Sequence, residues 1–225
     1  MSDIVEAHGG FVDKYIGDAI VAVFGAPHED PDHALNAVRS ALACRQRLGA
    51  MQAELGLPNG STLNARIGIN TGQILVGNIG SHRRFNYTVM GDAVNQAARF
   101  EPANKPFDTH IMIGQSTKEM SEEKIEVRFL AAMIVKGKTE PVLTYELVGK
   151  KGQVPADMMK VIEIFEEGWH LHEQQNWDEA IAKFDEALAI RPDDGPSRVY
   201  KEMCEDYKVE PPKEGWKGEW IQTEK

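Results

Sequence analysis

The chain of 225 residues lacks any apolar run long enough to span a lipid bilayer, and its first ten residues show neither the basic stretch nor the apolar segment of a secretion signal. Cysteine is scarce. Cys44 and Cys204 lie far apart in the sequence, without a Cys-x-x-Cys pair or a histidine at metal-ligand spacing. We therefore expect two reduced thiols and a cytoplasmic location for the chain as given.

Positive charge is also in short supply, with 25 Lys and Arg against 35 Asp and Glu and a formal net charge of −10. Because nonspecific binding to nucleic acids requires basic surface, the composition predicts no nucleic-acid partner, although it allows a local basic pocket for a nucleotide. The glycine-rich segment 77–80 lacks the Gly-Lys-Ser/Thr ending of a phosphate-binding P-loop. No Ser-His-Asp set or zinc-ligand set stands out either.

Hydrophobic periodicity in the first half predicts two hairpins separated by a helix. Residues 11–24 form two β-branched and aromatic runs that meet at Gly17-Asp18, which indicates a hairpin. Apolar residues then recur every three or four positions from Asp30-Pro31 to Gly56, which is typical of an amphipathic helix. Alternation in 63–69, the sequence Asn-Thr-Gly at 70–72 and a returning run at 74–79 predict the second hairpin.

The next segment predicts a strand over 85–90 that leads into a helix over 93–100, followed by a stretch that Pro102 and Pro106 interrupt. Further strands are expected at 111–113, 125–130 and 142–148, with a short helix at 116–121. Such a mixture of hairpins and helices predicts an α+β sandwich that carries its helices on one side of a sheet.

The character of the sequence changes near residue 149. We predict a domain over 1–149, a linker over 150–157, a helical hairpin over 158–208 and a tail over 209–225. The hairpin follows a tetratricopeptide pattern at Ile164, Gly168, Leu171, Ala180, Phe184, Ala187 and Pro192. Because one repeat cannot bury its own apolar face, it should pack on 196–207, on the preceding domain or on another chain. The tail, with Trp216 and Trp220, is expected to lie along a surface.

Taken one at a time, the polar residues of these elements are weak signals. Asp18 fits an ordinary turn, and Lys14 and Arg66 fit solvated strand positions. Asn95 and Arg99 share one helix face, as many surface residues do. From chemistry alone, the sequence indicates a domain with several basic groups near one acid.

The joint pattern says more. Four segments occur in order: Lys14-Tyr-Ile-Gly-Asp18, Arg66-Ile-Gly-Ile-Asn-Thr-Gly72, Tyr87-Thr-Val-Met-Gly-Asp-Ala-Val-Asn95-Gln-Ala-Ala-Arg99 and Val135-Lys-Gly-Lys138. In order and spacing they resemble the class III adenylate and guanylate cyclases, across roughly residues 5 to 148. The resemblance implies a ferredoxin-like nucleotide cyclase sandwich, here lacking its first strand, with a small all-α hairpin behind it.

The resemblance also implies a site between two catalytic domains of a head-to-tail homodimer, where Mg²⁺ or Mn²⁺ ions sit between two aspartates. Asp18 matches one of those aspartates. Arg66 matches an arginine on the triphosphate, and Lys138 a lysine that reaches it from the opposite subunit. Asn95 and Arg99 match the pair that orients the ribose and stabilises charge on the transferring phosphoryl group.

Two positions bear on the choice of base. Lys14 matches the lysine that donates to the adenine ring, and Thr88 stands where many relatives carry an aspartate that accepts from the adenine amino group. This pair resembles the Lys/Thr subgroup of adenylate cyclases, whereas guanylate cyclases place an acidic residue at the lysine position. We therefore expect ATP as the substrate and cyclic AMP as the signal, with guanylate cyclase activity as the alternative.

One element of the family pattern has no counterpart here. The first strand of the family carries the second metal-binding aspartate, and neither Asp3 nor Asp13 matches it. We expect the chain to be an N-terminally truncated piece of a longer cyclase that is inactive alone; the alternative is a non-catalytic module that binds a partner domain. Relatives with such a tail suggest a membrane-anchored parent, and the helical hairpin could hold a protein partner.

Overall fold

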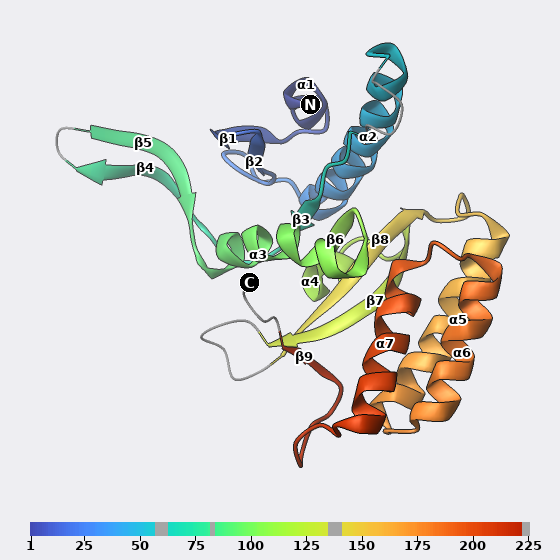
Figure 1. The fold of residues 1–225 in the computed structure, drawn as a ribbon. Helices are drawn as coiled ribbons and strands as arrows, with labels where there is room; N and C mark the ends of the chain where they lie inside the picture. Colours follow the sequence, from blue (N-terminus) through green and yellow to red (C-terminus); the bar gives the residue numbers. More distant parts are fainter. Residues whose placement is uncertain (57–62, 82–83, 135–140, 222–225) are drawn as a thin grey trace.

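The computed structural model describes residues 1–56, 63–81, 84–134 and 141–221 of the chain. Its centre is a five-stranded sheet with the order β3-β6-β8-β7-β9 (Figure 1). The strands of this sheet are β3 (Ile67–Ile69), β6 (Ile111–Gly114), β7 (Ile125–Ile134), β8 (Val142–Lys150) and β9 (Glu219–Ile221). The α+β fold class predicted from the sequence is confirmed.

Alternate residues of β6 show how the sheet is covered. Ile111 and Ile113 pack against one face of helix α2 (His33–Glu54), whereas Met112, between them, belongs to the core cluster on the opposite face. This alternation follows from the two-residue period of a strand. The expectation that all helices lie on one side of the sheet is therefore wrong.

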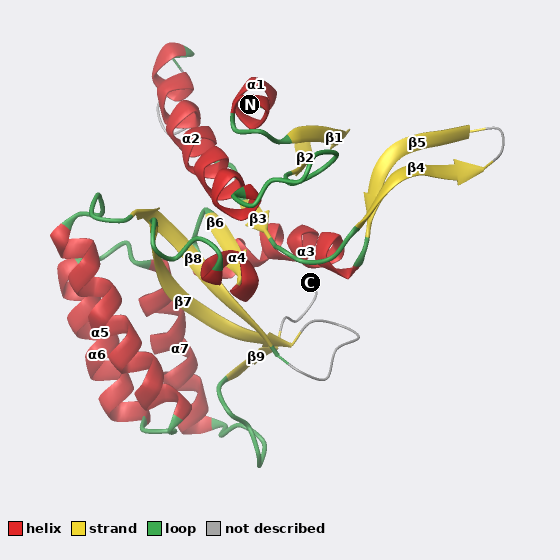
Figure 2. Cartoon of the chain, turned by 180° about the vertical axis from the view of Figure 1, so that it is seen from behind, coloured by secondary structure: helices red, strands yellow, loops and turns green. Residues whose placement is uncertain are grey.

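The opposite face carries α3 (Asp92–Phe107) and three C-terminal helices, α5 (Ala156–Glu173), α6 (Trp177–Ile190) and α7 (Gly195–Val209). Figure 2 shows these three helices as one layer beside β7. A single buried cluster joins all four helices to the sheet, with members Phe100, Phe107, Met112, Leu130, Met133, Phe165, Phe184 and Tyr200. The helical hairpin thus packs on the 196–207 helix and on the sheet, which were two of its expected partners.

Two short helices lie beside these layers. Helix α1 (Ser2–Ala7) packs against α2 and buries Val5, and α4 (Gln115–Glu119) follows β6. The expected helix over 30–56 is confirmed as α2. Among the described residues, no helix combines the length and the apolar composition that crossing a bilayer requires.

Strands β1 (Phe11–Ile16) and β2 (Ala19–Val23) form the predicted first hairpin, with Gly17 at a φ of +61° in its turn. The second hairpin was predicted wrongly. β3 pairs with β6, and the returning strand β4 (Leu75–Ser81) pairs instead with β5 (Arg84–Met90). The β4–β5 ribbon extends away from the body of the molecule, and we call it the arm (Figures 1 and 2).

Helix α3 is longer than the sequence predicted, because it continues through Pro102 and Pro106 to Phe107. A proline inside a helix removes one backbone hydrogen bond at a typical cost of about 3 kcal/mol. Here the helix buries Phe100, Ala103 and Phe107 completely or nearly so, and this packing offsets the loss.

The tail does not simply lie along a surface as expected. Residues Glu219–Ile221 form β9, which pairs in parallel with β7, and the tilted rings of Trp220 and Phe107 have their centroids 4.7 Å apart. The division of the chain near residues 149–157 stays a prediction, while the hydrophobic core runs across it. The tetratricopeptide assignment also stays a prediction, although Gly168 packs against Phe184 where α5 and α6 cross.

A buried ion pair network ties the C-terminal helices to the sheet. Arg128 of β7 donates from Nε and Nη2 to Oε2 of Glu146 in β8, and from Nη1 to both carboxylate oxygens of Asp194 at the start of α7. Burial disfavours its charge, but the two carboxylates keep the pKa of Arg128 above its ordinary value. Its guanidinium also lies 5.1 Å from the ring centre of Phe165 in α5.

Candidate active site

The two residues expected to choose the base lie together. Lys14 of β1 donates a hydrogen bond from Nζ to the Thr88 hydroxyl of β5 over 3.0 Å, although the residues are far apart in sequence. Phe11 and Tyr87 pack 6.0 Å apart beside them and hold the two strands in contact. The first hairpin and the arm therefore build one polar spot from a lysine and a threonine.

Asp18 lies in the turn between β1 and β2, directly after Gly17, and is exposed. A carboxylate in this position can reach a ligand in solvent. Among the described residues, no hydrogen bond or ion pair joins Asp18 to the other predicted site residues of this chain.

Asn95 and Arg99 stand one helical turn apart on α3, as the sequence predicted. The helix begins after Gly91, whose φ of +153° suits glycine, and a Cβ there would stand 3.2 Å from the Gln73 carbonyl oxygen. A side chain at this junction of β5 and α3 would be tight and its backbone strained, which favours glycine where α3 starts.

The Arg-Ile-Gly-Ile-Asn-Thr-Gly segment contacts α3 directly. A Cβ at Gly68 would meet the Ala97 carbonyl oxygen at 2.3 Å, so helix and strand touch through bare backbone. Asn70 donates from Nδ2 to the Ala93 carbonyl oxygen over 3.2 Å and to Gln96 Oε1 over 3.1 Å. This motif therefore positions the helix that carries Asn95, a role that sequence reasoning did not assign to it.

Arg66 directly precedes β3 and does not stand free. Its Nε donates to Glu101 of α3 over 3.0 Å, and both side chains are 43% exposed. Exposed pairs of this kind contribute about 0–1 kcal/mol. A triphosphate with several negative charges can therefore compete with Glu101 for the guanidinium.

Sequence reasoning missed one acid in this region. Asp13 lies beside Lys14 and Thr88 and accepts a hydrogen bond from the Thr88 hydroxyl over 3.1 Å. In the sequence, Asp13 was considered only as a possible second metal-binding aspartate, which it does not match. Lys138, by contrast, lies outside the described residues together with the rest of its Val-Lys-Gly-Lys motif.

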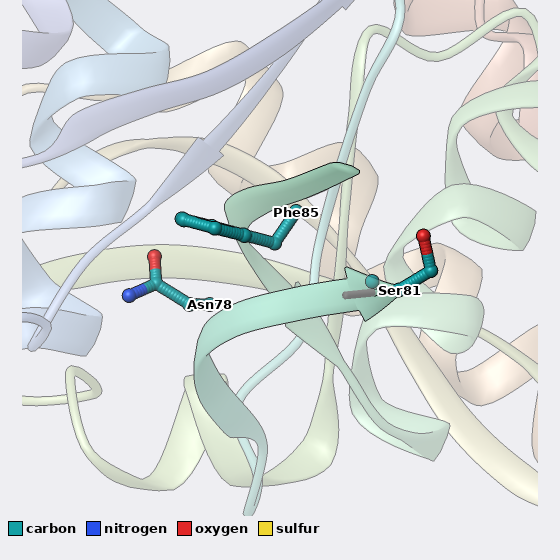
Figure 3. Close-up of a pocket in the computed structure, with 4 residues that line it drawn as sticks. Asn78, Ser81 and Phe85 are labelled. Atoms are coloured by element: carbon teal, nitrogen blue, oxygen red, sulfur yellow. The ribbon is translucent and has the colours of Figure 1, made fainter. Parts of the chain in front are cut away.

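A hollow of the described surface lies elsewhere, on the arm. Asn78, Gly80, Ser81 and Phe85 line it, and Figure 3 shows the side chains of Asn78 and Phe85 near each other over the ribbon. None of the predicted site residues lines this hollow. Within the described part of one chain, the candidate residues are thus spread over an open surface and do not enclose a nucleotide.

The fit of a divalent cation can be judged from Asp18. Mg²⁺ is commonly held by one or two carboxylates together with substrate phosphates and water. The exposed Asp18 carboxylate suits one such ligand, while the described residues hold no group of three or more metal-ligating side chains. The chain therefore fits a cation that the triphosphate itself helps to bind.

A family model described as the adenylate and guanylate cyclase catalytic domain matches residues 1–149. The chain belongs to this family. The match ends close to the predicted boundary of the first domain and contains every predicted site residue. The resemblance stated from the sequence motifs is confirmed.

Relatives of known name agree with this cyclase assignment. The chain is 35% identical over 201 residues to an adenylate cyclase of Dictyostelium discoideum, described as terminal-differentiation specific, and 37% identical over 151 residues to adenylate cyclase 1 of Rhizobium meliloti. These matches cover 87% and 66% of the chain but only 9% and 22% of the relatives. The first match extends beyond residue 149, so it includes part of the C-terminal helices.

Solved cyclase structures have the same fold. The adenylyl cyclase CyaB from P. aeruginosa superimposes with a TM-score of 0.61 at 30% identity, covering 68% of this chain and 79% of CyaB. The guanylate cyclase domain of RhGC from Catenaria anguillulae, solved with GTP, gives a TM-score of 0.55 at 32% identity, covering 66% and 78%. The fold is thus shared with cyclases of both base preferences, and the choice of base must come from individual residues.

Proposed function

We propose that this cyclase domain converts ATP to 3′,5′-cyclic AMP and pyrophosphate in cyclic-nucleotide signalling. The observation that carries the proposal is the Lys14–Thr88 hydrogen bond, which brings a donor and a hydroxyl together at the spot expected to read the base. Adenine offers a ring nitrogen that accepts and an amino group that donates. A lysine N–H and a threonine oxygen complement these two groups.

In the proposed reaction, the ribose 3′-hydroxyl oxygen bonds to the α-phosphorus, the bond from that phosphorus to the pyrophosphate oxygen breaks, and the hydroxyl proton passes to water. Asn95 orients the ribose, and Arg99 neutralises charge that develops on the phosphoryl oxygens. Arg66 exchanges Glu101 for the triphosphate. A divalent cation on Asp18 would supply further positive charge to the phosphates when bound.

The site is proposed to form between two chains. Large apolar side chains are exposed on the arm and at the end of β1, with exposed fractions of 65% for Leu75, 63% for Phe85, 54% for Met90 and 62% for both Tyr15 and Ile16. Monomeric proteins rarely leave such patches open. A second copy that covers them would sit beside Lys14 and Thr88, and it would enclose the nucleotide that one chain leaves open.

The test is the formation of cyclic AMP from ATP and of cyclic GMP from GTP, with Mn²⁺, by this chain and by a form extended upstream in its own gene. We expect cyclic AMP as the main product, and we expect its formation to be lost on Asp18→Ala. Activity only in the extended form would locate the missing ligand upstream. A well-folded extended form that makes neither product would reject the enzyme proposal.

Two alternatives have support of their own. The same exposed arm would serve a non-catalytic module that only assembles with a partner cyclase. Guanylate cyclase activity is favoured by the likeness to RhGC, which was solved with GTP. The product assay separates all three.

A further inference from the structure

The strand that carries Lys14 is irregular at the preceding residue. In the β1–β2 ladder Val12 pairs with Ala22 and Lys14 pairs with Val21, which leaves Asp13 as the extra residue of a β-bulge. Neighbouring side chains on a regular strand point to opposite faces. A bulge re-aims them, and here both Asp13 and Lys14 contact Thr88 of β5.

These three side chains form a closed triangle. The Thr88 hydroxyl donates to Asp13 Oδ2 over 3.1 Å, Lys14 Nζ donates to the Thr88 oxygen over 3.0 Å, and Lys14 Nζ lies 3.1 Å from Asp13 Oδ2. The Asp13 side chain is 1% exposed, whereas Lys14 is 46% exposed. The Asp13 carboxylate thus lies buried beneath Thr88 and Lys14, and the Lys14 ammonium group faces the solvent where a base would bind.

The hydrogen bonds within the triangle determine which donors and acceptors remain for a ligand. A threonine hydroxyl has one proton and two lone pairs, and an ammonium group has three N–H donors. The Thr88 proton points to Asp13, and one of its lone pairs takes a hydrogen bond from Lys14. One lone pair of Thr88 and one N–H of Lys14 remain for a ligand.

We propose that Asp13 is a positioning residue that determines base specificity by fixing the direction of the Thr88 hydroxyl. This inference rests on the proposed adenylate cyclase function. While its proton is directed to Asp13, Thr88 can only accept a hydrogen bond from a ligand and so selects the amino group of adenine. Guanine presents a carbonyl oxygen at that place and a ring N–H beside it. Its oxygen would face the accepting Thr88 oxygen, and its N–H would face the Lys14 donor, so neither pair could form a hydrogen bond.

Two further observations fit this role. Asp13 Oδ1 is buried without a hydrogen-bond partner among the described residues, which is an unfavourable arrangement for a residue that serves packing alone. Opposite Thr88 on the arm stands Gly77, and no described atom lies within 4 Å of the place where its Cβ would be. The face beside the Thr88 hydroxyl is therefore open to a planar base.

The experiment compares Asp13→Leu and Asp13→Asn with the wild-type protein, all in the form extended upstream that the test of function uses. A fluorescent ATP analogue is bound to each protein and displaced by ATP or by GTP, and the ratio of the two affinities is the readout. In Asp13→Leu the Thr88 proton is free to turn toward a carbonyl group, so we expect the preference for ATP over GTP to fall about tenfold, the effect of one hydrogen bond. Asp13→Asn keeps an acceptor oxygen beside Thr88 and should stay within about threefold of the wild type.

A double-mutant cycle isolates the mechanism. In a Thr88→Val background there is no hydroxyl to direct, so Asp13→Leu should leave the ATP-to-GTP ratio unchanged. Asp13→Ala serves in place of Asp13→Leu if the larger side chain prevents folding, as judged by circular dichroism. An unchanged ratio in Asp13→Leu, or an equal loss in Asp13→Asn, would overturn the inference. Absence of any preference for ATP in the wild type would instead reject the proposed function and this inference with it.

Discussion

At the scale of single residues, the buried His172 in α5 links stability to pH. It is fully buried, its Nδ1 lies 3.2 Å from the Cys204 sulfur, and its ring is surrounded by the side chains of Trp177, Tyr200, Tyr207 and Trp216. Burial lowers the pKa of His172 to about 4 and raises that of Cys204 to about 12. Both side chains are therefore neutral at physiological pH, and neither thiol of the chain is in a disulfide.

This lowered pKa predicts a loss of stability in acid. Between pH 6.5 and 4 the unfolded state binds a proton at His172 that the folded state does not, so the free energy of unfolding falls as the pH decreases, by up to about 3 kcal/mol. Chemical denaturation at a series of pH values measures this slope. His172→Phe should flatten it, whereas His170→Gln removes an exposed imidazole from the same helix and serves as the control. A slope that His172→Phe leaves intact would assign the effect to other groups.

Single residues of the site could be predicted only where a family motif contains them. Lys14 and Thr88 came from the motif, and the structure joins them. Asp13 could not be predicted, because a bulge of one residue leaves no mark in the alternation of apolar and polar positions. Its contact with Thr88 depends on the pairing of β1 with β2 and on the place of the arm beside them.

At the scale of elements, the contact of β3 with α3 fixes the site helix. We predict that Gly68→Ala forces α3 away from the strand, because the new Cβ would overlap backbone atoms of Ala97 and Glu101. The free energy of unfolding should fall by about 1–3 kcal/mol, and nucleotide turnover should fall with it. Gly49→Ala on α2 is the matched control, since its Cβ meets no described atom, and it should stabilise the chain slightly. Equal behaviour of both variants would contradict a tight contact at Gly68.

A second prediction concerns the arm. Phe85→Asp should convert a dimer to a monomer and abolish turnover, because a charged group replaces an apolar side chain that the partner would cover. Sedimentation velocity measures the change in mass. Val209→Asp, at the 87% exposed end of α7, introduces the same charge elsewhere and should leave the dimer intact. A wild-type chain that sediments as a monomer at high concentration would exclude the arm as a dimer contact.

The elements were predictable to different degrees for physical reasons. The turn at Gly17-Asp18 is local, so the first hairpin could be read from the sequence. The second hairpin was wrong because Asn70 and Gly72 look like turn residues, whereas Asn70 holds α3 and Gly72 lies against Ala93. The length of α3 was underestimated because burial of Phe107 outweighs the effect of two prolines.

At the scale of the whole molecule, the Arg128 network decides whether the C-terminal helices and the sheet behave as one unit. Arg128→Met leaves the carboxylates of Glu146 and Asp194 without their shared partner. Breaking a buried pair on one side typically costs about 3–5 kcal/mol. Chemical denaturation should show this loss, and the exposed Arg47→Met, which breaks a surface pair with Glu54, should change stability far less. If both variants lose the same amount, the network does not hold the layers together.

The layering of the molecule could be predicted only in part. The helical hairpin was expected from its repeat pattern, and its need for a covering surface was clear from its apolar face. Which surface it would choose depends on contacts such as Tyr200 with the Leu130 carbonyl oxygen, whose partners lie 70 positions apart in sequence. The pairing of β9 with β7 is more distant still, and no local pattern announces it.

That pairing also bears on the order in which the chain folds. Ala132 pairs with Glu219, so closing this loop of roughly ninety residues costs about 4 kcal/mol of chain entropy unless something shortens it. Helices α5, α6 and α7 follow one another and contact their neighbours in sequence, so they can form early. Once these helices have assembled on the sheet, they bring Trp220 close to β7, the strand with which β9 pairs. The helical layer would then act as a template during folding, and the last strand would lock in place as the final event.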